Sequence, residues 1–242
     1  MNVICVIPAR YDSKRFPGKP LAEISGKPML CMVYENAANS KLVNRAIVAT
    51  DSEKVASACK QYGMEFIMTA GTHETPTSRI YEVSTKVDAD YYVFLGGDEP
   101  LIAPESIDTV VSTALSSRAA VTHGMTKIKT APEVIDFTNI KVVTNPDNYL
   151  LYTSRSPLPY PKGGLSFDYK KFVGAGVFNK SAIKAFYDTP QSELERIEEC
   201  DLIRFLELGI PVKMQEIYCR NVSVDTPKDL EKVARILRGE RE

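Results

Sequence analysis

The sequence predicts an α/β protein with a mainly parallel, Rossmann-like sheet, helices on both faces and a β-rich insertion. Through the first half of the 242-residue chain, runs of β-branched and aromatic residues alternate with stretches whose apolar residues recur at helical spacing. The strand-like runs are apolar throughout, which is typical of parallel strands covered on both faces. After about residue 128 the chain becomes rich in turns and prolines, which indicates the insertion.

Strands and helices are expected to alternate in the first half of the chain. Pro28 and Pro104 suit a first helical turn, where the missing N–H is no loss, so they mark two helix starts. The predicted strands cover residues 3–7, 46–50, 65–69, 91–95 and 120–125. The predicted helices cover residues 28–38, 53–62, 77–87 and 104–117.

The second half is less regular. The turn sequence at residues 145–148 separates two β-like runs, so residues 141–144 and 150–153 are expected to form a hairpin. Prolines and glycines crowd residues 157–164, which predicts an irregular loop. Further strands are predicted at 172–178, 212–216 and 222–224, and helices at 192–208 and 226–238. With no internal repeat or linker, residues 1–242 are expected to form a single domain whose insertion spans about 128–190.

Composition excludes several classes of partner. The chain has 30 Lys and Arg against 31 Asp and Glu, so it lacks the basic field that drives non-specific nucleic-acid binding. Its five cysteines form no CxxC pair, and their scatter is not typical of a disulfide framework, so a cytoplasmic location is expected. The apolar start is too short for a signal peptide, and no stretch approaches a membrane span.

The loop after the first strand, residues 9–19, concentrates positive charge. This opening loop carries four cations, and Gly18 permits close backbone approach; the cations are Arg10, Lys14, Arg15 and Lys19. In open parallel sheets ligands bind at the carboxyl ends of strands, and both Arg and Lys pair with phosphate oxygens. The loop is therefore interpreted as a polyphosphate site, with a solvated surface loop as the alternative. Its glycine spacing matches neither a P-loop nor GxGxxG.

Two carboxylates follow predicted strands. Asp98 lies in Gly-Gly-Asp-Glu-Pro, residues 96–100, and Asp225 lies in Val-Asp-Thr-Pro, residues 224–227. Mg²⁺ usually takes one or two protein carboxylates, with phosphates and water completing its shell, so this pair is a candidate magnesium site. The alternatives are an Asx-type turn at Asp98 and a helix N-cap at Asp225. Zinc is not expected, because His73 and His123 are the only histidines and lack paired ligand spacing.

Five segments spread along the chain carry a family resemblance. They are IPARYDSKRFPGKPL, VATD, MTAGTHETPTSR, GGDEP and VDTPKDL. Together they resemble the CMP-KDO synthetases, the cytidylyltransferases that activate 3-deoxy-manno-octulosonate (KDO), almost from end to end. The resemblance implies a nucleotidyltransferase fold and attack of a sugar-acid hydroxyl on the α-phosphorus of CTP, with release of pyrophosphate. Such a displacement needs positioning and charge neutralisation more than covalent chemistry.

The resemblance also implies roles for individual residues. Arg10, Lys19 and Asp98 would be catalytic, the two cations by holding the triphosphate, and Asp98 and Asp225 would hold Mg²⁺. Arg79 and Arg155 would face the acid's carboxylate or the nucleotide. The family is expected to be homodimeric, with the insertion as the contact. The positions expected around the nucleotide are Ala9, Arg10, Ser13, Lys19, Met68, Thr69, His73, Thr77 and Gly97.

The chain departs from the family pattern where the acid would bind. Gly96, Phe172 and Leu202 replace a Gln, a His and a Gln; Gly176 replaces a Tyr; and Thr75-Pro76-Thr77 replaces Ser-Gly-Thr. Lost hydrogen-bonding partners cost about 1–3 kcal/mol each, so KDO itself is expected to bind weakly. The first hypothesis is a cytidylyltransferase for KDO or a related sugar acid. Alternatives are a cytidylyltransferase for another acid, such as a phosphonate, and an inactive nucleotide-binding module.

Overall fold

The computed structural model describes residues 1–12, 15–163, 167–219 and 222–240. Its main sheet runs in the order β11-β7-β10-β6-β1-β4-β5, and only β10 on this path is antiparallel to its neighbours. The predicted mainly parallel sheet is therefore confirmed. The strands are β1 (Val3–Pro8), β4 (Arg45–Thr50), β5 (Phe66–Met68), β6 (Tyr91–Leu95), β7 (Val121–Lys127), β10 (Lys170–Asn179) and β11 (Val212–Glu216).

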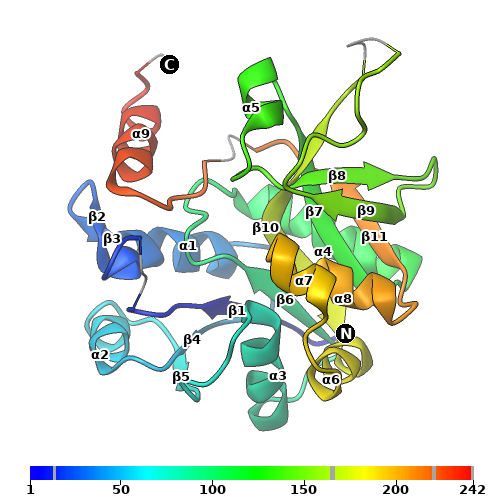
Figure 1. The fold of residues 1–242 in the computed structure, drawn as a ribbon. Helices are drawn as coiled ribbons and strands as arrows, with labels where there is room; N and C mark the ends of the chain where they lie inside the picture. The colour runs from blue at the N-terminus through cyan, green and yellow to red at the C-terminus, as the bar shows by residue number, and fades with distance from the viewer. Residues whose placement is uncertain (13–14, 164–166, 220–221, 241–242) are drawn as a thin grey trace.

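Helices cover both faces of the sheet (Figure 1). Alternate residues of β1 enter two separate cores: Val3, Cys5 and Ile7 pack on one face, and Ile4 and Val6 on the other. The first core is closed by α1 (Met29–Ala38), α2 (Glu53–Gln61) and α4 (Pro104–Ser117). The second is closed by α3 (Pro76–Lys86), α6 (Lys180–Asp188) and α8 (Leu202–Glu207). This double burial is why the strands are apolar throughout.

The segment between β7 and β10, called the insertion below, adds a small hairpin to the main sheet through β10. The predicted hairpin is confirmed as β8 (Lys141–Thr144) and β9 (Leu150–Ser154), and β8 also pairs with β10. The short helix α5 (Ala131–Ile135) precedes it. Several short elements escaped prediction: α5, the 3-10 helix Lys19–Leu21, the small ribbon of β2 (Glu23–Ile24) and β3 (Lys27–Pro28), and α6. No described helix is long and apolar enough to cross a membrane.

Two predicted elements are wrong. The expected helix 192–208 is broken into α7 (Glu193–Glu198) and α8, because Glu199 adopts a left-handed backbone with φ 47°. The break lets Arg204 donate to both carboxylate oxygens of Glu195, at 2.5 and 2.7 Å, whereas nine residues of continuous helix would separate them by about 13 Å. Residues 222–224 form no strand; instead the Val224 N–H donates to Asp98 O at 2.9 Å. The last helix, α9 (Pro227–Leu237), is confirmed.

Candidate active site

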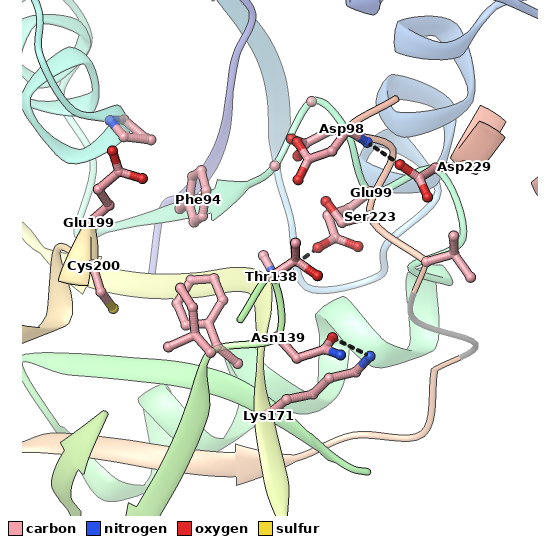
Figure 2. A pocket seen from close by; sticks show the side chains of 18 of the residues that line it. Phe94, Asp98, Glu99, Thr138, Asn139, Lys171, Glu199, Cys200, Ser223 and Asp229 are labelled. Carbon is pink, nitrogen blue, oxygen red and sulfur yellow. Dashed lines mark hydrogen bonds between the residues drawn. The ribbon is translucent and has the colours of Figure 1, made fainter. Parts of the chain in front are cut away.

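A cleft of about 1890 Å³ opens at the carboxyl ends of β1 and β6. Its walls come from the opening loop, the GGDEP loop (residues 96–100), β10, the insertion and the segment before α9. Figure 2 shows Phe94 pointing into the cleft between Asp98 on one side and Cys200 on the other. Most predicted site residues line it: Ala9, Arg10, Lys19, His73, Thr77, Arg79, Gly96, Gly97, Asp98, Arg155, Phe172, Leu202 and Asp225.

Lys19 joins the two predicted metal carboxylates. Its Nζ donates to Asp98 Oδ2 at 2.7 Å and to Asp225 Oδ1 at 3.3 Å. The left-handed turn at Gly18, with φ 74°, directs the chain into the 3-10 helix Lys19–Leu21 and so presents the lysine to the cleft. Burial alone would lower the pKa of Lys19, but the attraction of Asp98 and Asp225 outweighs it and raises that pKa above its ordinary value. The lysine therefore stays charged between the carboxylates.

Asp225 is not the cap of the last helix. Thr226 is the N-cap, and it forms a capping box with Asp229: the Thr226 N–H donates to Asp229 Oδ2 at 2.8 Å. Asp225 Oδ1 instead accepts from Arg15 Nη2 at 3.0 Å as well as from Lys19. The alternative of a plain N-cap at Asp225 is therefore wrong. Its carboxylate is held toward the cleft by cations of the opening loop.

The two carboxylates suit Mg²⁺. Because one ammonium nitrogen contacts both Asp98 and Asp225, their oxygens converge on a single point where a hard cation could bind. Among the described residues no group of three or more His, Cys, Asp or Glu converges in this way. Two carboxylates are the number that Mg²⁺ usually takes from a protein, with phosphates and water completing its shell.

The glycines of the GGDEP loop are required by close packing. A Cβ on Gly97 would lie 2.9 Å from Pro8 O, and a Cβ on Gly96 would lie 2.8 Å from Asp98 Oδ1. Glu99 was not predicted as a site residue; it is buried and accepts from the Gly174 N–H at 3.3 Å. Burial, with a smaller effect of Asp98, raises the pKa of Glu99 to about 8. Its place in the same short motif as Asp98 was the available signal.

The segment 73–79 forms another side of the cleft. Thr75 is the N-cap of α3, accepting from the Ser78 N–H at 3.1 Å. His73 Nε2 contacts Glu82 Oε2 at 2.5 Å, and the Thr77 N–H donates to Asp201 Oδ2 at 3.2 Å. These contacts fix the loop that carries His73 and Thr77 against the cleft.

Two residues predicted around the nucleotide lie outside the cleft lining. Met68 and Thr69 are at the end of β5 and are not among the described residues that line the cleft. Ser13 lies outside the described residues. Arg79 is buried, and its guanidinium donates to Thr69 Oγ1 and, at 3.0 Å, to Asp51 Oδ2. The structure thus gives Arg79 internal partners, whereas it was expected to face the acid's carboxylate or the nucleotide.

The far end of the cleft is less polar. Phe172 and Leu202 line it as predicted, together with His123, whose ring stacks on Phe172 with centroids 4.3 Å apart. Gly176 is not among the described residues that line the cleft. It lies beneath the His123 ring, so closely that a Cβ on residue 176 would be 2.4 Å from His123 Cδ2. From the sequence, His123 was weighed only as a metal ligand, so its place in the cleft wall was not predicted.

Arg155 lines the far end but is held by backbone oxygens. Its Nε donates to Glu198 O at 2.8 Å and its Nη1 to Phe137 O at 3.0 Å. It also approaches Glu199 Oε2 at 3.6 Å. These contacts join the insertion to the turn between α7 and α8, so part of the guanidinium's donor capacity is already used.

Comparison with known proteins places the chain in a family. A family model described as "Cytidylyltransferase" matches residues 4–231. A protein of Geobacter sulfurreducens named 3-deoxy-manno-octulosonate cytidylyltransferase is 39% identical, over 96% of this chain and 98% of that protein. One of the same name from Escherichia coli is 38% identical over 99% and 97%.

A solved structure agrees with these relatives. It is described as CMP:2-keto-3-deoxy-manno-octonic acid synthetase complexed with CTP, and it is 37% identical with a TM-score of 0.93 over 99% of both chains. Structures below 25% identity, such as a Leptospira borgpetersenii cytidylyltransferase at 17% with a TM-score of 0.67, share the fold. The resemblance carried by the five sequence segments is confirmed, and the chain belongs to the cytidylyltransferase family of nucleotidyltransferases.

Proposed function

We propose that this enzyme transfers CMP from CTP to a KDO-like sugar acid and releases pyrophosphate. The observation that carries the proposal is that Asp98 and Asp225 both contact the Lys19 ammonium. They do so beside the opening loop, at the carboxyl ends of the parallel strands. The names of full-length relatives near 40% identity, and of the solved structure with CTP, support the donor and the class of acceptor. Retention of both carboxylates argues against an inactive nucleotide-binding module.

In the proposed reaction an acceptor hydroxyl attacks the α-phosphorus of CTP. A new P–O bond forms, the bond from the α-phosphorus to the bridging oxygen breaks, pyrophosphate leaves with that oxygen, and the proton of the hydroxyl passes to water. Arg10 is exposed in the cleft and makes no ion pair within the described part of the chain, so it is available to the triphosphate. Lys19 would neutralise charge on the phosphates after exchanging a carboxylate contact for a phosphate contact.

Asp98 and Asp225 would hold Mg²⁺, which supplies charge withdrawal from the α-phosphate and orientation of the incoming hydroxyl. The cleft-lining Ala9, His73, Thr77 and Gly97 are proposed to surround the nucleotide. Thr69, which accepts a hydrogen bond from Arg79, and its neighbour Met68 would support that wall from behind. Ser13, which lies outside the described residues, is the remaining residue proposed to contact the nucleotide. Arg155, Gly96, Phe172, Gly176 and Leu202 are proposed to shape the acceptor end.

The insertion is proposed to join two copies of the chain. Four large apolar side chains there are strongly exposed: Ile135 at 73%, Phe137 at 68%, Leu151 at 58% and Tyr160 at 80%. Such exposure on a folded protein is typical of an interaction surface. Sedimentation of the wild type should give a dimer, and Ile135→Asp should give a monomer. A wild type that sediments as a monomer at micromolar concentration would contradict the proposal.

Pyrophosphate release tests the proposed reaction. Wild-type protein with CTP, Mg²⁺ and KDO should release pyrophosphate, and Asp98→Asn should lower turnover by about 10²-fold or more, because one metal ligand is lost. Asp147→Asn, an exposed turn position of the β8–β9 hairpin, is the matched control and should retain activity. Full activity of Asp98→Asn would refute the metal assignment. The inactive module would be favoured if the protein bound CTP but released no pyrophosphate with any acid tested. The acids are KDO, amino-substituted KDO, sialic-type acids and small phosphonates.

A further inference from the structure

A row of three residues crosses the sheet beneath the far end of the cleft. Gly176 of β10 is in register with Phe94 of β6 on one side and with His123 of β7 on the other. Since the middle residue has no side chain, the two flanking rings approach each other across it, with centroids 6.2 Å apart. Both rings line the cleft, and Figure 2 shows Phe94 directed into it.

His123 lies over the glycine and extends this surface to Phe172. The His123 and Phe172 rings stack with centroids 4.3 Å apart and an interplanar angle of 24°. A Cβ on residue 176 would lie 2.4 Å from His123 Cδ2 and 2.7 Å from Nε2, so a larger residue there would displace the ring. Gly176 therefore permits three rings to pack together at the base of the cleft, with His123 buried against Phe94 and Phe172; they are defined here as the aromatic floor.

The aromatic floor is uncharged at neutral pH. Burial lowers the pKa of His123 to about 4, so its imidazole is neutral. Phe178 and Leu202 line the cleft beside it and add apolar surface. A substrate hydroxyl pressed against the two phenyl rings would lose its hydrogen bonds to water and gain none from them. Carbon–hydrogen groups would pack there without that loss.

We propose that His123 is a specificity-determining residue and that the acceptor acid presents an apolar edge, a deoxygenated carbon or an alkyl group, to the aromatic floor. The inference rests on the proposed function, since it names the acceptor class of that same site. It assigns to His123 the task of excluding hydroxyls by occupying the space above Gly176 with a neutral ring. No proton transfer is assigned to this residue.

Steady-state kinetics with matched acceptors tests the inference. At saturating CTP, KDO is compared with a set of KDO analogues that each lack one hydroxyl. At least one analogue should have a kcat/KM about tenfold or more above that of KDO, because the buried hydroxyl it lacks would be unsatisfied. His123→Ala should reduce that preference by about tenfold and leave the KM for CTP unchanged, since the ring no longer covers the space. Tyr62→Ala, an exposed aromatic at the end of α2, is the matched control.

The variant His123→Phe distinguishes two explanations of the preference, an apolar ring at residue 123 and an imidazole that hydrogen-bonds to the acid. It should restore the preference that His123→Ala loses; a further loss would mean that the ring nitrogen recognises a polar group, which overturns the inference. Equal kcat/KM for KDO and every analogue would also overturn it while leaving the proposed function intact. If no acid yields pyrophosphate, the proposed function fails, and calorimetry with the same acids decides the inference. Selective binding weakened by His123→Ala would sustain it, and unselective or absent binding would refute it.

Discussion

Replacing His123 with Phe should remove a pH dependence of stability. In the folded protein burial lowers the pKa of His123 from about 6.5 to about 4. The neutral ring therefore stabilises the fold above pH 6.5, and that stability is lost as the pH falls toward 4, because the unfolded chain takes up the proton first. The loss attributable to this residue is about 2 kcal/mol at pH 5 and about 3 kcal/mol at pH 4.

Equilibrium unfolding in urea, followed by far-UV circular dichroism, measures this effect. Both proteins are unfolded between pH 8 and pH 4, and the difference in unfolding free energy is plotted against pH. The comparison cancels other titrating groups, including Glu99, whose raised pKa of about 8 acts in the opposite direction. The difference should shift in favour of His123→Phe by about 2–3 kcal/mol over this range. A difference independent of pH would refute a buried, neutral His123.

Three further predictions concern the cleft and its support. Lys19→Met should abolish turnover and should also tighten Mg²⁺ binding in the absence of CTP, because the ammonium no longer competes for Asp98 and Asp225. Calorimetry measures the metal affinity, and an unchanged affinity would contradict this prediction. Glu195→Gln should destabilise the fold by about 3–5 kcal/mol in urea unfolding, by leaving the buried Arg204 charge unpaired, and a loss below about 1 kcal/mol would contradict it. Gly97→Ala should lower the melting temperature and kcat, whereas Gly163→Ala, with open space around its Cβ, should change neither; equal effects would contradict the packing argument.

Hydrophobic patterning was sufficient to predict most of the fold. The strands at 91–95, 141–144 and 212–216 have the predicted bounds, because continuous apolar runs and turn signals locate buried strands directly. The helix 192–208 was beyond such reasoning. Its break at Glu199 brings Glu195 into contact with Arg204, a pair of residues that a continuous helical pattern would place far apart.

The candidate site was predicted as a set of residues rather than as an arrangement. Short motifs located Lys19, Asp98 and Asp225, but a helix cap and a metal ligand have the same sequence signature, and the capping box of Thr226 distinguishes them only in three dimensions. His123 escaped because its contribution depends on Gly176, a residue 53 positions away whose missing side chain makes the space. The space left by a missing side chain cannot be recognised as a motif in the sequence.

The link between the GGDEP loop and the segment before α9 affects how the enzyme is made. Asp225 lies 206 residues after Lys19, yet its carboxylate contacts that lysine, and the adjacent Val224 is tied to Asp98 through the backbone. Synthesis runs from the N-terminus, so residue 225 leaves the ribosome long after residues 19 and 98. The carboxylate pair can therefore form only after residue 225 has been added, and a product that ends before residue 225 would lack half of it.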